Sequence, residues 1–195
     1  MTLVPRIEIC GNIASGKTTL SKGITACGLK SGKESFSNNP FIKDFYKNSR
    51  MFSFETEITF LLQHYHSIKT TEAINSIVCD YSLTLDKAYS DVTLPPGRRY
   101  IFMQIAEELE YEIGLPEKII HLQCPEEVLL SRIKKRRRYF ESSITIDYLR
   151  SLTLAIENRV REIPSHVEVV TINSHKINFT EGIADSPELA SICQF

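Results

Sequence analysis

The chain has 195 residues, of which 42% are hydrophobic and 24% charged, and its formal net charge is -1. This length and composition predict one globular domain over residues 1–195 with a sizeable core. The near-zero net charge excludes a global basic field for nucleic acid, so we expect no nucleic-acid partner, and an anionic ligand must be held by local groups.

The expected elements alternate along the chain. In chain order they are a strand at 6–10, a helix at 16–27, a strand at 33–36, helical patterns over 40–74, a strand at 77–79, an amphipathic stretch at 102–113, a strand at 118–122, helices at 125–135 and 148–162, and a strand at 167–172. Such alternation predicts parallel βαβ units and an α/β, doubly wound, five-stranded parallel sheet with helices on both faces. The tail after Gly182 is expected to be loosely packed or a short helix.

The cysteines and the N-terminus bear on location. The five cysteines are scattered, with no CxxC pair, which argues against a disulfide framework and a zinc site. The first six residues lack the apolar region of a signal peptide, and no apolar run has the length of a membrane span. We therefore expect a cytoplasmic location and no membrane partner.

A phosphate-binding loop follows the first expected strand. The segment fits GxxxxGK[ST] at every fixed position, and its expected ATP-binding residues are Gly11, Asn12, Ile13, Ala14, Ser15, Gly16, Lys17, Thr18 and Thr19. The glycines allow backbone N–H groups to approach phosphate oxygens, and the following helix adds the positive end of its dipole. Lys17 is expected to reach the β- and γ-phosphates, and Thr18 to bind Mg²⁺ through its hydroxyl.

Absent motifs narrow the class of P-loop protein to which this sequence can belong. Neither the NKxD nor the DxxG motif of Ras-type GTPases occurs, and motor and transporter ATPases need much longer chains. A single domain of this length suits a kinase of small molecules.

Four segments together carry a family resemblance. They are GNIASGKTTL at 11–20, ESFSNNPFIKDFY at 34–46, DYS at 80–82 and RIKKRRRYFE at 132–141. The chain resembles the deoxynucleoside kinase family, specifically its bacterial deoxyadenosine/deoxyguanosine kinase branch. The resemblance implies the three-layer P-loop nucleoside/nucleotide-kinase fold with an arginine-rich lid at about 132–145, and a homodimer. It also implies transfer of the γ-phosphoryl of ATP to the 5′-OH of a purine (deoxy)nucleoside.

The resemblance assigns roles on the phosphate side. Glu34 would bind the sugar 5′-OH and act as general base, although a solvated loop glutamate is the alternative. Asp80 would hold Mg²⁺ directly or through water, or else serve as an N-cap for the next segment. The lid arginines Arg132, Arg136 and Arg138 would stabilise charge on the transferred phosphoryl group, although a charge run over 134–138 also fits a solvated helix face.

Further assignments and departures concern the acceptor side. Tyr46 and Glu141 match groups that contact the sugar, although Tyr46 also fits a core tyrosine. Glu57 stands where the family has glutamine; it could accept hydrogen bonds from guanine N1–H and N2–H, or be protonated. His64 and Tyr81 replace arginines. We expect phosphoryl transfer to be retained with a shifted acceptor specificity.

Competing hypotheses remain from other classes. A nucleoside monophosphate kinase needs a further cationic clamp, which Arg98 and Arg99 could supply. A nucleotide-binding module without turnover is disfavoured by the joint presence of four residues, Lys17, Thr18, Glu34 and Asp80. A basic-patch nucleic-acid binder is disfavoured by the net charge.

Overall fold

The computed structural model describes residues 5–26, 29–32, 38–71 and 77–179. Its strands form one parallel sheet in the order β2-β3-β1-β4-β5. Their bounds are β1 Arg6–Gly11, β2 Lys30–Gly32, β3 Ile77–Cys79, β4 Lys118–Gln123 and β5 Glu168–Asn173. The prediction of an α/β fold with a parallel sheet is confirmed. The strand expected at 33–36 lies outside the described residues, and the strand that pairs with β3 is the preceding segment.

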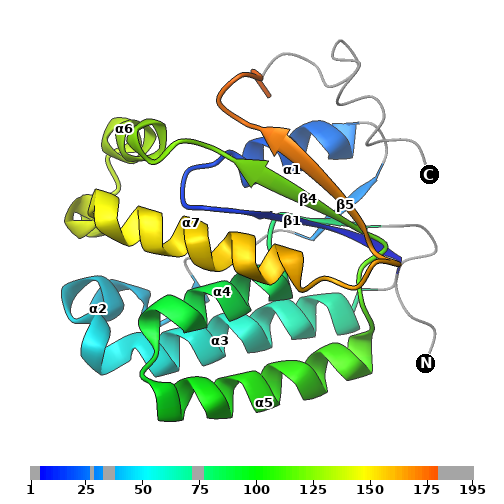
Figure 1. The fold of residues 1–195 in the computed structure, drawn as a ribbon, viewed down its shortest axis with the longest axis horizontal. Coiled ribbons are helices and arrows are strands. Elements are labelled where there is room, and N and C mark those ends of the chain that lie inside the picture. Colours follow the sequence, from blue (N-terminus) through cyan, green and yellow to red (C-terminus); the bar gives the residue numbers. More distant parts are fainter. Residues whose placement is uncertain (1–4, 27–28, 33–37, 72–76, 180–195) are drawn as a thin grey trace.

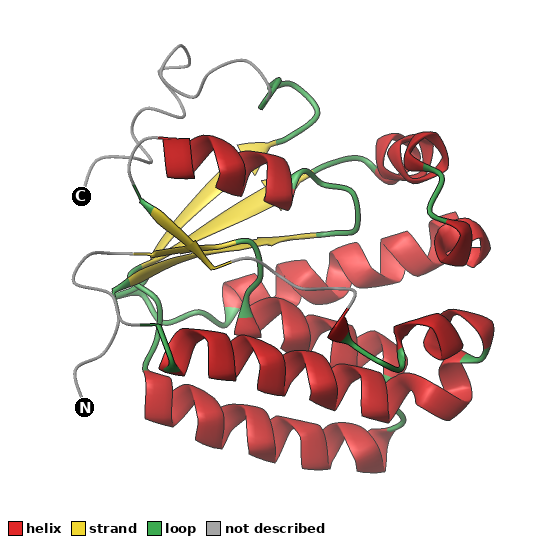
Figure 2. Cartoon of the chain, turned by 180° about the vertical axis from the view of Figure 1, so that it is seen from behind, coloured by secondary structure: helices red, strands yellow, loops and turns green. Residues whose placement is uncertain are grey.

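Helices lie on both faces of this sheet (Figures 1 and 2). Helix α1 covers one face, and a layer that contains α3, α4, α5 and α7 covers the other. The helical bounds are α1 Lys17–Ala26, α2 Ile42–Lys47, α3 Ser49–Lys69, α4 Leu83–Thr93, α5 Pro96–Ile113, α6 Glu126–Arg136 and α7 Ile146–Arg161, with a 3₁₀ helix η2 at Tyr139–Ser143.

Three helical predictions need correction. The pattern over 40–74 is two helices in its described part, because Asn48 interrupts it and its side chain caps α3 by accepting from the Met51 N–H (3.3 Å). Helix α4 was not predicted at all. Helix α5 begins at Pro96, six residues before the predicted start, because proline is accepted in the first helical turn.

The central strand β1 places apolar side chains toward α1. Ile7 and Ile9 are fully buried and pack in one cluster with Leu20 and Ile24 of α1. Cys10 belongs to the cluster on the opposite face, where α4, α6 and α7 pack. Since successive side chains of a strand point to opposite faces, β1 joins both layers of the core.

A buried ion pair of β1 connects the strand to two helices. Arg6 Nε donates to Glu8 Oε1 (2.7 Å), and the Arg6 guanidinium also donates to the carbonyl oxygens of Ile113 (3.1 Å) and Gly114 (2.6 Å). Glu8 Oε2 accepts from the Leu83 N–H at the start of α4 (3.2 Å). The pair thus fixes the end of α5 and the start of α4 beneath the sheet.

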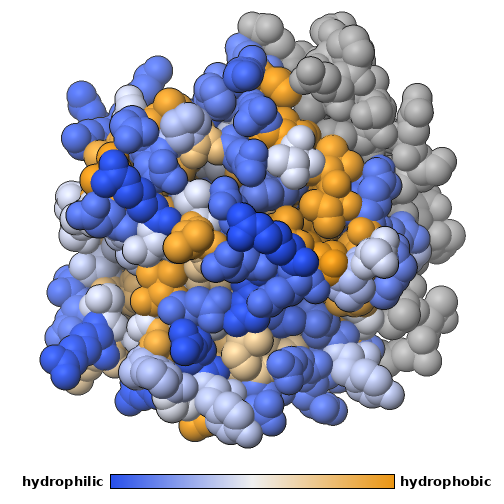
Figure 3. Space-filling model, viewed as in Figure 1, coloured by the Kyte–Doolittle hydropathy of each residue, from blue (hydrophilic) through white to orange (hydrophobic). Residues whose placement is uncertain are grey.

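The surface is mostly hydrophilic on the face that α7 crosses, with apolar residues in separate patches (Figure 3). On the outer helices, several large apolar side chains are exposed, namely Met51 and Leu62 of α3 and Tyr100, Ile101 and Tyr111 of α5. None of the helices in the described part is long and apolar enough to cross a membrane.

Candidate active site

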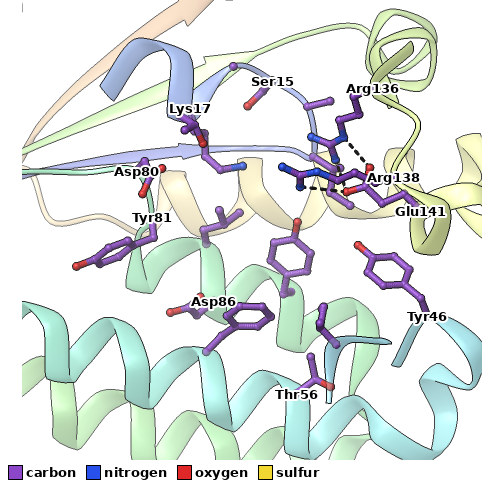
Figure 4. Close-up of a pocket in the computed structure, with 18 of the residues that line it drawn as sticks. Ser15, Lys17, Tyr46, Thr56, Asp80, Tyr81, Asp86, Arg136, Arg138 and Glu141 are labelled. Carbon is purple, nitrogen blue, oxygen red and sulfur yellow. Dashed lines mark hydrogen bonds and ion pairs between the residues drawn. The ribbon is translucent and has the colours of Figure 1, made fainter. Parts of the chain in front are cut away.

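A cavity of about 530 Å³ opens beside the carboxyl ends of β1 and β3. The phosphate loop, α2, α3, α4, α6, η2 and α7 all contribute side chains to its lining (Figure 4). Ligands of open α/β sheets bind at this edge, because helix N-termini and loops converge there. The cavity is therefore the candidate site.

The phosphate loop runs from the end of β1 to the start of α1, as the motif predicts. Its backbone needs glycine at Gly16, where φ is 106°, and a Cβ on Gly11 would lie 2.8 Å from Ser15 Oγ and 2.9 Å from the Leu122 carbonyl oxygen. Lys17 Nζ donates to the carbonyl oxygens of Gly11 (2.8 Å) and Asn12 (3.1 Å). The ammonium group thus lies over the loop, within the cavity lining.

Asn12 ties this loop to α7. Its Nδ2 donates to the Leu149 carbonyl oxygen and to Thr153 Oγ1, each at 2.9 Å. Its Oδ1 accepts from the N–H of Ile13 (2.6 Å). The side chain is 4% exposed, so it acts as a buried brace, which the motif alone does not indicate.

Arg132 braces the same loop from α6. The guanidinium donates to the carbonyl oxygens of Ala14 (3.2 Å) and Ser15 (3.4 Å), and to that of Ser174 after β5 (3.0 Å). From the family resemblance, this arginine was expected to stabilise charge on the transferred phosphoryl group. The structure places it in the cavity lining, but its hydrogen bonds go to backbone carbonyls.

Arg136 and Arg138 converge on one carboxylate. Arg136 donates to both oxygens of Glu141 (2.6 and 2.5 Å), and Arg138 NH1 lies 3.5 Å from Glu141 Oε1. Glu141 is buried, whereas Arg136 and Arg138 are partly exposed. Figure 4 shows this trio at one end of the cavity, with Tyr46 beside it. Burial, with Glu141 nearby, raises the pKa of the Tyr46 hydroxyl, so it remains a proton donor.

The residues expected to hold Mg²⁺ both line the cavity. Asp80 directly follows β3 and is 3% exposed, and Thr18 lies in the first turn of α1. No group of three acidic, histidine or cysteine side chains in the described part is arranged as a metal site. One carboxylate and one hydroxyl fit Mg²⁺, because this ion keeps several waters and binds substrate phosphates.

The same cavity is also lined by buried titratable groups. Glu57 of α3 accepts from Thr93 Oγ1 (3.0 Å), and burial raises the pKa of its carboxyl group to about 8. His64 Nδ1 lies 2.8 Å from Asp86 Oδ2. Burial also raises the pKa of Asp86, against the opposing effect of His64. Tyr81 also lines the cavity and stacks on His64, whose charge acts on Glu57, so the three departures from the family pattern are neighbours.

Similarity to known proteins agrees with this geometry. A sequence model of the family described as deoxynucleoside kinase matches residues 7–191. The chain belongs to the deoxynucleoside kinase family. It is 28% identical over 200 residues to deoxyguanosine kinase from Bacillus subtilis (strain 168), covering 98% of this chain and 97% of that protein. It is 27% identical over 174 residues to deoxyadenosine kinase from Dictyostelium discoideum, covering 86% and 71%.

The fold of this deoxynucleoside kinase is shared with a solved relative. Deoxyadenosine kinase from M. mycoides with bound dCTP superposes with a TM-score of 0.81 at 20% identity, over 96% of each chain. Membership of the family makes the chain a phosphotransferase that acts on a nucleoside hydroxyl and uses a nucleoside triphosphate as donor.

Most predicted site residues of the deoxynucleoside kinase meet in this cavity. Glu34, the predicted base, lies outside the described residues. Gly11 and Asn12 support the loop without lining the cavity, while the other described site residues, from Ile13 to Glu141, line it. Three further residues that line it were not expected from the sequence, namely Asp86, Tyr89 and Tyr148. Asp86 and Tyr89 lie on α4, the helix that was not predicted, so no pattern pointed to them.

Proposed function

We propose that this family member is an ATP-dependent deoxynucleoside 5′-kinase with a preference for purine nucleosides. The observation that carries the proposal is the continuity of one cavity from the phosphate loop to Tyr46, Glu57 and Glu141. A donor phosphate on the loop and a nucleoside at the other end would share this space. The names of the relatives, deoxyguanosine and deoxyadenosine kinases, support the purine preference.

In the proposed reaction, the loop N–H groups and Lys17 bind the donor phosphates. Glu34 accepts the proton of the nucleoside 5′-OH as its oxygen forms a bond to the γ-phosphorus. The bond from that phosphorus to the β,γ-bridging oxygen breaks, and ADP leaves. Mg²⁺, held through Thr18 and Asp80, would supply charge neutralisation.

Segment 132–145 is proposed as the lid. Arg136 and Arg138 project from it, and planar guanidinium groups suit the three oxygens of a phosphoryl group in transfer. Glu141 holds Arg136 in a fixed orientation through two hydrogen bonds. Arg132 would act by positioning the loop.

The alternative of a nucleoside monophosphate kinase finds less support. It needs a cationic clamp on the acceptor's phosphate, and Arg98 and Arg99 were the candidates. Arg98 lies over the ring of Phe54, 5.5 Å from its centroid, and neither arginine lines the cavity. A nucleoside without a phosphate is therefore the better acceptor.

We further propose that the protein is a homodimer that associates through α3 and α5. Met51, Tyr100, Ile101 and Tyr111 expose 51–86% of their surface there, and large exposed apolar side chains on outer helices suit an interface. The thiols of Cys10, Cys79 and Cys124 are free, which fits the cytoplasmic location that the sequence predicts.

The test is phosphoryl transfer from [γ-³²P]ATP to a panel of nucleosides. We expect labelled 5′-monophosphates of purine deoxynucleosides, loss of at least 100-fold in kcat for Glu34→Gln, and a similar loss for Lys17→Ala. Lys22→Ala is the matched control, because Lys22 is exposed on the same helix α1. Labelling of nucleoside monophosphates but not of nucleosides would refute the proposal.

A further inference from the structure

The carboxyl group of Glu57 is buried at the acceptor end of the cavity. Its side chain lines the cavity, and the residue is 4% exposed. Within the described ranges, Thr93 Oγ1 is the one hydrogen-bond donor to this group, and it reaches Oε1. The second oxygen, Oε2, therefore remains available to a molecule bound in the cavity.

The surroundings of Glu57 do not favour a negative charge. The titratable groups that face it are His64 on its own helix α3, Asp86 on α4, Tyr148 on α7 and Tyr46 on α2. Asp86 repels a second negative charge, and His64 already hydrogen-bonds Asp86 (2.8 Å). Burial raises the pKa of both tyrosine hydroxyls, so they stay neutral. No lysine or arginine of the described part forms an ion pair with Glu57.

The Thr93 hydroxyl offers a charged Glu57 little compensation. Thr93 Oγ1 also lies 2.9 Å from the Tyr89 carbonyl oxygen, which accepts its single proton equally well. A hydroxyl has one proton to donate, so these two acceptors share it. An ionised carboxylate needs two or more full donors, or a cation, to remain stable at such burial.

We propose that Glu57 reads the acceptor base as a neutral carboxylic acid, which pairs with a base edge that has an N–H next to an unprotonated ring nitrogen. Oε1 accepts from the base N–H, and the proton on Oε2 is donated to the ring nitrogen. A neutral acid presents the same donor and acceptor pair as an amide. The inference rests on the proposed nucleoside kinase function and names the acceptor class as bases with such an edge, of which adenine, through N6–H and N1, is the purine that requires the neutral acid.

Ionisation of Glu57 would change which base fits. A carboxylate only accepts hydrogen bonds, so its second oxygen would face the lone pair of the adenine ring nitrogen. Guanine tolerates either form, because it offers N1–H beside O6 to the acid and N1–H beside N2–H to the carboxylate. Adenine binding should therefore weaken with rising pH while guanine binding should not.

The experiment compares full-length wild type with Glu57→Gln, an amide that does not titrate. We measure kcat/KM with deoxyadenosine and with deoxyguanosine from pH 6.5 to 9.5, since kcat/KM reports groups of the free enzyme. For deoxyadenosine, the ratio of E57Q to wild type should rise about tenfold per pH unit once Glu57 ionises. For deoxyguanosine, the ratio of E57Q to wild type should vary by less than about threefold over this pH range. The other titrating groups are present in both proteins, so their effects cancel in both ratios.

Thr93→Val provides a second, independent arm. The Thr93 hydrogen bond lowers the pKa of Glu57, so its removal should move the midpoint of the deoxyadenosine profile to higher pH. If both nucleosides are phosphorylated but the deoxyadenosine ratio of E57Q to wild type is constant with pH, the neutral-acid proposal alone is overturned. The same holds if the deoxyguanosine ratio rises as much as the deoxyadenosine ratio. Failure of wild type to phosphorylate or bind either nucleoside overturns the proposed function and this inference together.

Discussion

The imidazole ring of His64 stacks on the phenol ring of Tyr81, with 4.3 Å between ring centroids and 4° between ring planes. Both residues stand where the related family pattern has arginine. The two substituted residues thus lie together as one stacked pair beside the cavity. The carboxyl group of Asp86 lies within hydrogen-bonding distance of His64 Nδ1. An aromatic pair with one acid replaces two cations, which removes positive charge from the acceptor end.

We expect His64→Ala to destabilise the fold by about 2–4 kcal/mol, because it removes the stack and leaves the buried Asp86 carboxyl group without its hydrogen bond. Urea unfolding followed by circular dichroism measures this. His66→Ala is the matched control, since His66 is exposed on the same helix α3, and we expect a change below about 0.5 kcal/mol. Equal effects of the two variants would contradict a structural role for the stack.

Arg137→Gly should stabilise the protein. Arg137 ends α6 in the left-handed region, with φ 53° and ψ 37°, a conformation that favours glycine at a helix C-terminus. We expect a gain of about 0.5–1 kcal/mol, seen by calorimetry as a melting temperature about 2 °C higher. Arg137→Ala removes the same charge but keeps a Cβ, so it should bring no such gain; if it does, charge and not backbone strain is the cause.

Asn12→Ala should raise the KM for ATP by about tenfold. The substitution removes both hydrogen bonds from the loop to α7, so the loop N–H groups lose their fixed orientation. Steady-state kinetics with varied ATP test this. Thr153→Val removes one of the two acceptors and leaves the Leu149 carbonyl oxygen, so its effect should be smaller. An unchanged KM for ATP in N12A would show that the loop is held without this brace.

Glu57→Gln should stabilise the protein at neutral pH and above. The folded pKa of about 8 exceeds the ordinary value of 4.5, so between these values the unfolded chain releases a proton that the folded chain retains. Ionisation of Glu57 therefore lowers the stability of wild type as pH rises through this window, and E57Q lacks this contribution. The gap should be near zero at pH 4 and on the order of 4 kcal/mol near pH 8.

The control for this series is Glu108→Gln, because Glu108 is exposed on α5. Its stability should follow that of wild type at every pH, as measured by urea unfolding from pH 4 to 8.5. An E57Q protein that is less stable than wild type at pH 8 would mean that Glu57 is charged and favourably solvated.

Two kinds of sequence signal predicted the fold well. The strand predicted at 77–79 agrees with β3 in both bounds. A short apolar run between polar residues is typical of a buried strand. The loop of Gly11 to Thr18 follows β1 and opens α1, because its fixed positions encode backbone geometry.

Helix α4 escaped prediction for a physical reason. Its buried positions include Asp86 and Ser90 beside Leu83 and Leu85, so polar residues interrupt the apolar period. The Ser82 side chain makes no cap hydrogen bond, and the N–H of Leu83 is instead satisfied by Glu8, which is 75 residues away. A cap supplied by a distant strand leaves no local signature.

Most residues that the sequence suggested for the site line one cavity, but their contacts and protonation states were not predictable. The arginine spacing identified Arg132, but its contacts with the carbonyl groups of Ala14 and Ser174 depend on how α6 packs against two loops. The neutral state that we infer for Glu57 comes from burial against Asp86, which the sequence does not reveal. Glu34, the predicted base, lies outside the described residues and remains a prediction.

The position of β1 in the middle of the sheet bears on the order of folding. This strand begins at Arg6, yet its two neighbours are β3 at Ile77 and β4 at Lys118, and Arg6 also binds backbone near Gly114. Every partner is separated by more than 65 residues, and such non-local pairing slows folding. During synthesis, the first strand leaves the ribosome long before its neighbours exist. Its ladder with β4 and the hydrogen bonds of Arg6 near Gly114 cannot form until those segments have been synthesised.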